Sequence, residues 1–284
     1  MAFAARPDVP FLSEGPAALI DRLRQKLRAV EAATGLGVDC AGAVALGIPP
    51  IDAALGGGLA TGALHEIAAA RETETAAASG FALALAARSR REARTGSQDA
   101  GTGAAIVWIA EDLSLAENGA PYGPGLDEAG IAPERLLMVT AARGREVLWA
   151  MEEALRCRAV GMVIGEIRPH NIDQVATRRL ALAAAAGGTL GLILRTAPDD
   201  APSAAVTRWI IGAAASALFS GSNDERWHGI GPPRLTAHLV RNRRGHLGAW
   251  ILEWNSVEQR FELATHSEPV AGAALDRPHR AAAG

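Results

Sequence analysis

Apolar residues along the chain alternate between short continuous runs and longer stretches in which they recur at helical spacing. The short runs predict strands at residues 64–68, 104–110, 136–140, 161–165 and 189–195. The longer stretches predict helices at residues 77–94, 145–156 and 172–186. This alternation is typical of an α/β fold in which helices flank a mostly parallel sheet. Runs without internal alternation, such as 161–165, predict central strands that are buried on both faces.

The two ends of the chain follow other patterns. Residues 17–33 predict an amphipathic helix, in which Leu19, Leu23 and Leu27 form an apolar stripe between basic residues. Two runs about a glycine-containing turn within residues 234–255 predict a C-terminal β-hairpin. The residues from 266 onward have little to bury and are predicted to be disordered. We therefore expect a leader and helix over 1–43, a core over 44–265 and a tail over 266–284.

Composition narrows the class of protein. A hydrophobic content of 49% and a charged content of 21% are typical of soluble globular proteins. A net charge of -3 excludes a globally basic nucleic-acid binder but leaves room for a local basic patch. Cys40 and Cys157 form no CxxC pair, which predicts reduced thiols. Because we find neither a signal peptide nor an apolar run of about 20 residues, we expect a cytoplasmic protein.

The most specific stretch is LGIPPIDAALGGGLATGALHEI, residues 46–67, in which a glycine-rich turn leads into a predicted strand. It resembles the segment before the phosphate loop of RecA-like ATPases. Further matching stretches are VWIAED, ALRCRAVGMVIGEI, RRLALAAAAGGTLGLILR, PSAAVTRW and HLVRNRRG. With these, residues 44–255 resemble the ImuA family, RecA-like proteins of bacterial damage-induced mutagenesis cassettes. The resemblance implies a RecA-like, P-loop-type core.

The loop after the strand at 64–68 departs from the pattern of that core. In RecA-like ATPases a glycine, a lysine and a serine or threonine there hold phosphates and magnesium. The corresponding positions, in a loop that includes Ala69, are occupied by Glu74, Thr75 and Ala76. The lysine is absent, and a carboxylate ~4 Å from a phosphate is repelled by about 1–4 kcal/mol. We expect a degenerate phosphate loop that has lost ATP, with no cofactor and no metal.

Two acids stand at positions that the resemblance marks as catalytic. Glu111 matches the glutamate that activates water, and Glu166 matches the acid that supports magnesium. Thr196 stands where these ATPases carry a glutamine that senses the terminal phosphate. Without the lysine, we interpret both acids as solvent-tolerant residues at strand ends. They are catalytic candidates only if the chain is a divergent ATPase.

Positive charge is concentrated at the predicted hairpin tip, on Arg241, Arg243 and Arg244. In recombinase-like cores, basic residues of the matching hairpin reach the nucleotide of a neighbouring subunit. Here nucleic-acid phosphate, an acidic partner and plain solvent all remain open. The predicted loop 195–209 carries Asp199 and Asp200, which disfavours recombinase-style DNA binding.

Histidine and tryptophan residues give weaker signals. His65 and His170 have no second metal ligand at useful spacing and are predicted to be structural. The tryptophans Trp209, Trp250 and Trp254 are predicted to be core or interface anchors.

The resemblance implies a function and a set of partners. ImuA proteins are partnered with ImuB, a polymerase-like protein, and through it with an error-prone polymerase and the sliding clamp. RecA is a further implied partner, and direct DNA contact is the weaker alternative. The leading hypothesis is a non-catalytic accessory protein of translesion DNA synthesis. The alternatives are a divergent RecA-like ATPase of DNA repair and an SOS-type inhibitor of cell division. The leucine stripe at Leu19, Leu23 and Leu27 either docks a partner or packs on the chain's own core.

Overall fold

The computed structural model describes residues 42–96, 105–168, 172–216, 218–220 and 228–264, together with Arg22 and Lys26. Predictions that lie outside these residues are those for Leu19, Leu23, Leu27, Cys40, His170 and the tail 266–284. The chain divides into two compact units, Met1–Asp39 and Cys40–Gly284. In the first unit only Arg22 and Lys26 are described, and both are helical and exposed.

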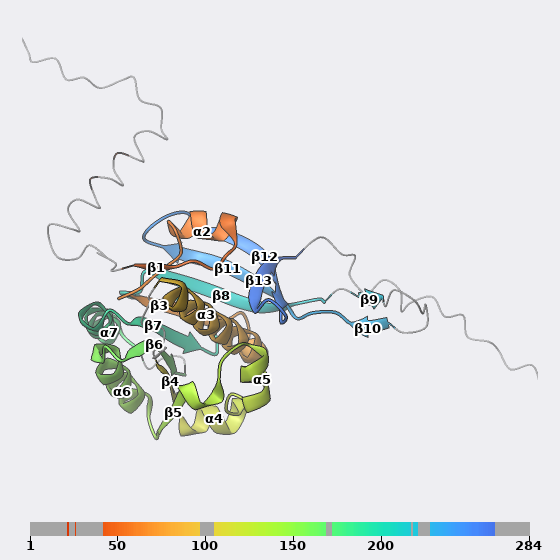
Figure 1. Ribbon diagram of the computed structural model, residues 1–284. Coiled ribbons are helices and arrows are strands. Elements are labelled where there is room, and N and C mark those ends of the chain that lie inside the picture. Colours follow the sequence, from red (N-terminus) through yellow and green to blue (C-terminus); the bar gives the residue numbers. More distant parts are fainter. Residues whose placement is uncertain are drawn as a thin grey trace, which may run out of the picture. The chain divides into compact units, whose positions relative to one another are not determined.

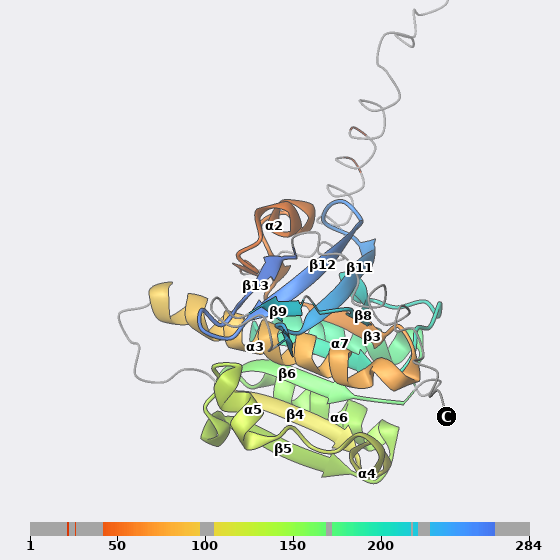
Figure 2. The same ribbon diagram turned by 90° about the vertical axis from the view of Figure 1, so that its right-hand side faces the viewer.

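The second unit is built on a nine-stranded sheet (Figures 1 and 2). In spatial order its strands are β13 (Arg260–Leu263), β12 (Gly248–Asn255), β11 (Arg234–Asn242), β8 (Thr207–Ala214), β3 (Leu64–Ala69), β7 (Leu190–Arg195), β6 (Val160–Glu166), β4 (Ala105–Glu111) and β5 (Leu136–Ala141). The strands from β8 to β5 are parallel to one another. The strands β11, β12 and β13 extend the sheet in antiparallel fashion. The predicted α/β class with a mostly parallel central sheet is therefore confirmed.

Helices cover both faces of the parallel strands (Figure 1). The helices of this unit are α2 (Pro49–Leu55), α3 (Thr75–Gly96), α4 (Asp112–Asn118), α5 (Gly123–Glu128), α6 (Gly144–Arg156) and α7 (Gln174–Gly187). On one face α3 packs against the sheet and encloses a core that contains Phe81, Trp108 and Trp209. On the other face α6 and α7 pack a second core around Met151 and Leu180. Burial on both sides explains why central strands such as β6 and β7 are mostly apolar.

The glycine-rich stretch before β3 is shaped by close backbone approach. The side chain of Asp52 accepts hydrogen bonds from the N–H groups of Leu46 (2.7 Å) and Gly47 (3.0 Å), which fixes the turn that enters α2. Gly56 ends α2 with a φ of 71°. At Gly58, with a φ of 132°, a Cβ atom would lie 2.4 Å from the carbonyl oxygen of Val44. This contact explains why the chain carries glycine here.

Two short antiparallel strand pairs lie outside the nine-stranded sheet. The pairs are β1 (Ala43–Val44) with β2 (Leu59–Ala60) and β9 (Leu218–Ser220) with β10 (His228–Ile230).

All five predicted strands and all three predicted helices are confirmed within a few residues. The predicted hairpin is β11 and β12. The interpretation of residues 195–209 as one loop was wrong at its end, because Thr207 begins β8. Strands β8 and β13 and the short helices α4 and α5 were not predicted.

Candidate functional site

The segment in the place of the phosphate loop runs directly from β3 into α3. Residues 72–74 form a 3-10 turn, and α3 begins at Thr75. No residue from 70 to 75 has a positive φ, although a phosphate-binding nest of N–H groups alternates right-handed with left-handed residues. The N–H of Ala70 donates to the carbonyl of Ile211 (2.7 Å), and that of Glu74 donates to the carbonyl of Arg71 (2.8 Å). These two N–H groups are therefore already used within the fold.

A carboxylate of the chain itself occupies this segment. Glu74 accepts a hydrogen bond from the Arg71 guanidinium (2.8 Å), and the Glu74 side chain is only 11% exposed. This bond with Arg71 holds the pKa of Glu74 below its ordinary value; desolvation opposes the shift, and the N–H of Ala213 supports it. The hydroxyl of Thr75 donates to the carbonyl of Glu72 (2.7 Å). The segment thus presents an ionised carboxylate in place of a lysine, and its threonine hydroxyl is engaged by the backbone.

The other predicted loop residues hold no ligand group. Ala69 is the last residue of β3 and is buried, while Ala76 is exposed in the first turn of α3. Neither side chain offers a polar atom, so the two alanines add nothing that could bind phosphate or magnesium.

Glu166 is held by three neutral donors at the end of β6. Its carboxylate accepts hydrogen bonds from Ser114 Oγ (2.6 Å), Trp108 Nε1 (3.2 Å) and Asn118 Nδ2 (3.2 Å). The residue is 3% exposed. A buried carboxylate must be satisfied by donors or by a cation, and here the protein supplies the donors. The arrangement fixes α4 against β4 and β6 and is that of a structural acid.

Glu111 ends the neighbouring strand β4. Its Oε1 accepts the backbone N–H of Arg168 at 3.3 Å, and the residue is 7% exposed. Because Ala110 is the Cα partner of Glu166 in the parallel pairing of β4 and β6, the two acids lie at adjacent strand ends. The structure therefore brings together the two predicted catalytic candidates, although each of them already has partners.

The basic residues of the hairpin lie toward the opposite end of strand β8 from the phosphate-loop segment. In the pairing of β8 with β11, Arg241 faces Arg208 near the start of β8, and Arg234 faces Ala214 at its end. The phosphate-loop segment meets β8 through the Ala70 N–H bond to Ile211 and through Glu74, which accepts from the N–H of Ala213. Since strands rise about 3.3 Å per residue, these two positions lie roughly 10–17 Å along β8 from Arg208. The hairpin arginines therefore do not replace the missing lysine within one chain.

A buried group of charges that the sequence did not predict lies on the sheet next to the hairpin. Glu66 on β3 accepts hydrogen bonds from Arg208 Nε (2.6 Å), Ser203 Oγ (2.7 Å) and Arg195 Nη2 (3.3 Å). Arg195 also bonds Asp199 at 2.8 Å. Glu66 and Arg195 are 1% and 3% exposed. We call these five residues the Glu66 cluster; it joins β3, β7, β8 and the loop between β7 and β8.

Arg241 borders the Glu66 cluster and differs from the other hairpin arginines. The Arg243 guanidinium donates to the carbonyl of Ser203 (3.1 Å), and that of Arg244 donates to the carbonyl of Gly56 (3.5 Å). Within the described part of the chain the Arg241 side chain makes no hydrogen bond or ion pair. Burial lowers the pKa of Arg241, and the charges of Arg243 and Arg208 add to this effect. Arg241 lies in β11 rather than in the turn, and the nearby carboxylate of Glu66 opposes this lowering of its pKa.

His65 is a buried histidine with two partners. Its Nε2 lies 2.9 Å from the carbonyl of Ala60, and its Nδ1 lies 2.8 Å from the hydroxyl of Thr207. The carbonyl can only accept, so Nε2 carries the proton and Nδ1 accepts from Thr207. Burial lowers the pKa of His65 to about 4, the bond to Ala60 opposes the shift, and the charge of Arg244 adds to it. The predicted structural role of this histidine is confirmed.

The predicted tryptophan anchors divide into two kinds. Trp209 is fully buried beside Phe81, with ring centroids 5.5 Å apart. Trp250 and Trp254 are partly buried and pack against the same core. Among the residues that the structure describes, no group of three or more His, Cys, Asp or Glu could hold a metal ion. No helix in the described ranges is both long and apolar enough to cross a membrane.

The strand order and the closed phosphate-loop segment define the class of the protein, a RecA-like α/β protein with a degenerate phosphate loop. No family model matches the chain. The chain is 32% identical over 225 residues to Protein ImuA of Caulobacter vibrioides strain NA1000 / CB15N, and the match covers 74% of this chain and 82% of that protein. Protein ImuA of strain ATCC 19089 / CIP 103742 / CB 15 matches equally. The chain therefore belongs to the ImuA family, which connects it with damage-induced mutagenesis at the level of the family.

Proposed function

We propose that the protein is a non-catalytic accessory protein in damage-induced mutagenesis, acting in translesion DNA synthesis through protein contacts. The observation that supports this most is the pairing of Glu74 with Arg71 in the segment where an ATPase needs a lysine. An ionised carboxylate repels phosphate, and the segment has no left-handed residue with which to form a nest. The RecA-like core then acts as a scaffold rather than as a motor.

The partner that we propose is an ImuB-like, polymerase-related protein, and through it an error-prone polymerase and the sliding clamp. RecA is a second proposed partner. Arg241 and Arg243 are the contact residues that we favour, because Arg241 carries a half-buried charge beside two other arginines without an ion pair among the described residues. An acidic segment of the partner would offset that repulsion. The leucine stripe at Leu19, Leu23 and Leu27 remains a proposed docking element.

A divergent ATPase is the second candidate. It is favoured by the position of Glu111 and Glu166 at adjacent strand ends. It is opposed by the three hydrogen bonds that engage Glu166 and by the absence of any cation at the phosphate-loop segment other than Arg71, which is paired with Glu74.

Complementation of a strain that lacks the gene separates the two candidates. We expect Glu111→Gln to restore the frequency of damage-induced mutants to the wild-type level, since the scaffold needs no activated water. The double change Arg241→Glu and Arg243→Glu is expected to lower that frequency on the order of tenfold, because it places like charges against an acidic partner. Mutant frequency after ultraviolet irradiation is the measurement.

Arg145→Glu is the matched control, because Arg145 is exposed on α6 and belongs to none of these sites. It should behave as wild type. A Glu111→Gln variant that no longer supports mutagenesis, although it is folded and expressed normally, would favour the ATPase instead.

A further inference from the structure

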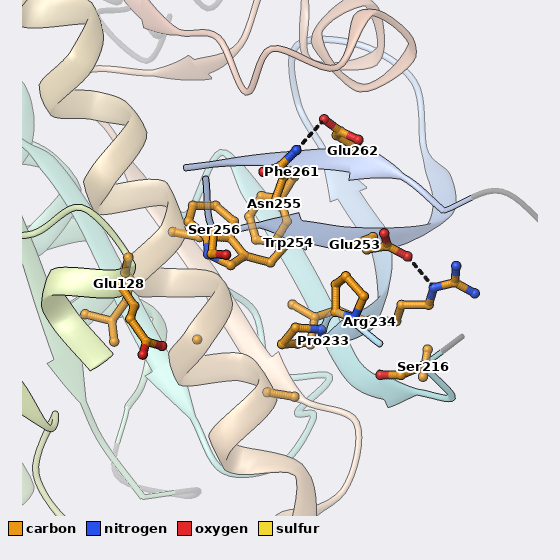
Figure 3. Close-up of a pocket in the computed structure, with 18 of the residues that line it drawn as sticks. Glu128, Ser216, Pro233, Arg234, Glu253, Trp254, Asn255, Ser256, Phe261 and Glu262 are labelled. Carbon is orange, nitrogen blue, oxygen red and sulfur yellow. Dashed lines mark hydrogen bonds and ion pairs between the residues drawn. The ribbon is translucent and has the colours of Figure 1, made fainter. Parts of the chain in front are cut away.

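A pocket of about 840 Å³ opens beside the closed phosphate-loop segment (Figure 3). It lies between α3, α5, the end of β8, the start of β11 and the turn that joins β12 to β13. Its volume is within the range of ~300–1,000 Å³ that is usual for binding pockets. Ala213, which lines the pocket, donates its N–H to Glu74.

The wall that α3 contributes is made of small residues. Ala76, Ala77 and Gly80 line the pocket. A Cβ atom at Gly80 would meet no other heavy atom within 4 Å. Glycine in the body of a helix is less stable than alanine, so packing gives no reason for it at this position. Because glycine has no side chain, Gly80 leaves the pocket open on the α3 side.

The opposite wall is aromatic. Trp254 and Phe261 meet edge to face, with ring centroids 5.0 Å apart and planes at 71°. Phe261 is buried in the core and holds the partly exposed Trp254 in place. Val257, in the turn between the two strands, is 92% exposed at the rim. A rigid aromatic surface with an exposed aliphatic neighbour is typical of a protein-binding hot spot.

Carboxylates surround this apolar surface. Glu128 stands on the α5 side, and Glu253 and Glu262 stand on the other side (Figure 3). Arg234, the only cation among the lining residues that the structure describes, is paired with Glu253 at 2.6 Å. Glu262 is paired with Arg260 at 3.0 Å, so Glu128 is the one carboxylate of the three without an ion pair among the described residues, and it leaves the rim with a net negative charge. Such a rim repels a nucleotide or any other phosphate-bearing ligand and attracts lysine or arginine.

We propose that this pocket docks a helical segment of a partner protein, which inserts an apolar side chain against Trp254 and places a basic residue beside Glu128. An amphipathic helix in a hydrophobic groove combines these two chemistries. The inference rests on the proposed function as a scaffold and adds to it a binding surface and the chemistry of the occupant. This surface is distinct from the Arg241 site, which attracts the opposite charge.

A labelled helical peptide of leucine, alanine and lysine, with leucines four positions apart, is the probe. We expect saturable binding to the full chain in fluorescence anisotropy, and binding at least about tenfold weaker when glutamates replace the lysines. Gly80→Leu fills the open space and is expected to weaken binding of the lysine peptide at least about tenfold. Glu128→Lys is also expected to weaken binding of the lysine peptide.

Two controls accompany these variants. Glu146→Lys makes the same charge change on α6, which packs on the other face of the sheet, and should leave the affinity for the probe unchanged. Gly80→Ala adds one methyl group and should largely keep binding while it raises the midpoint of thermal unfolding by about 2–4 °C. If Gly80→Leu also raises the midpoint of thermal unfolding, its loss of peptide binding is not caused by a loss of folding.

Four outcomes would overturn the proposal. They are no binding of the lysine peptide, binding that Gly80→Leu does not change, competition by adenosine at equal affinity, and self-association in sedimentation that Gly80→Leu abolishes. Adenosine would mark a nucleoside site, and self-association would mark a second copy as the occupant. If the probe fails while ATP also fails to bind, only the pocket is refuted and the scaffold function stands.

Discussion

Replacing Glu66 by leucine is expected to lower the free energy of unfolding by about 3–5 kcal/mol. Glu66 is the acid that Arg195 and Arg208 share in the Glu66 cluster, and its side chain is 1% exposed. Its removal leaves the guanidinium groups of Arg195 and Arg208, whose side chains are 3% and 13% exposed. Asp199 is then the one carboxylate left in the Glu66 cluster. An uncompensated buried charge cannot recover its lost hydration. Urea denaturation, followed by circular dichroism, measures the change.

Two further variants test the reason for this loss. Glu153→Leu removes an exposed partner of Arg156 and should cost less than about 1 kcal/mol. Adding Arg195→Met and Arg208→Met to Glu66→Leu removes the stranded charges and should recover a large part of the stability. If Glu66→Leu alone is as stable as wild type, the Glu66 cluster does not hold β3, β7 and β8 together.

Acidification from pH 7.5 to 4.5 is expected to remove about 2–3 kcal/mol of stability through His65 alone. The pKa of His65 is lowered from 6.5 to about 4 in the folded protein, chiefly by burial. Below pH 6.5 the unfolded chain takes up a proton that the folded chain resists, so unfolding becomes more favourable. The contribution is fully present above the unfolded pKa and is lost as the pH falls toward the folded pKa.

The measurement is urea unfolding at both pH values for wild type and for His65→Gln. Glutamine can still donate to the carbonyl of Ala60 and accept from Thr207, but it does not titrate. We expect the variant to lose about 2–3 kcal/mol less than wild type on acidification. His238→Gln, at an exposed site on β11, should lose as much as wild type. Equal losses in wild type and His65→Gln would contradict the neutral, buried state of this histidine.

The parallel part of the fold was predictable because its signals are local. Strands such as β6 and β7 are continuously apolar, and the helices between them carry helical periodicity over three or more turns. Strand β8 was not predicted, because it follows a loop rich in proline and aspartate. Its alternation of Trp209 and Ile211 with Arg208 and Ile210 marks a strand with one face toward the core.

The Glu66 cluster could not be predicted, because its contacts depend on register. Glu66 meets Arg195 and Arg208 across 129 and 142 residues of sequence. Only the parallel pairing of β3 with β7 and β8 brings these side chains to one place. An acid inside an apolar strand is the one signal that was present, since such a residue needs a partner.

The phosphate-loop segment shows both what sequence can indicate and what it leaves out. The absence of lysine and glycine was visible at Glu74, Thr75 and Ala76 and predicted a degenerate loop. The pairing of Glu74 with Arg71, three residues earlier, is local but is one of several that the sequence allows. The pocket beside Gly80 brings together α3, α5 and the β12–β13 turn, so it follows only from the packing.

Calorimetric titration of the purified protein with ATP and magnesium, alone and with its polymerase-like partner, tests the central claim most directly. The carboxylate of Glu74 and the missing nest predict no heat of binding at millimolar ATP in either case. Saturable binding of ATP by the folded chain would contradict the account. It would show that phosphates are held by groups other than those of the segment between β3 and α3, and Glu111 would become a catalytic residue to test.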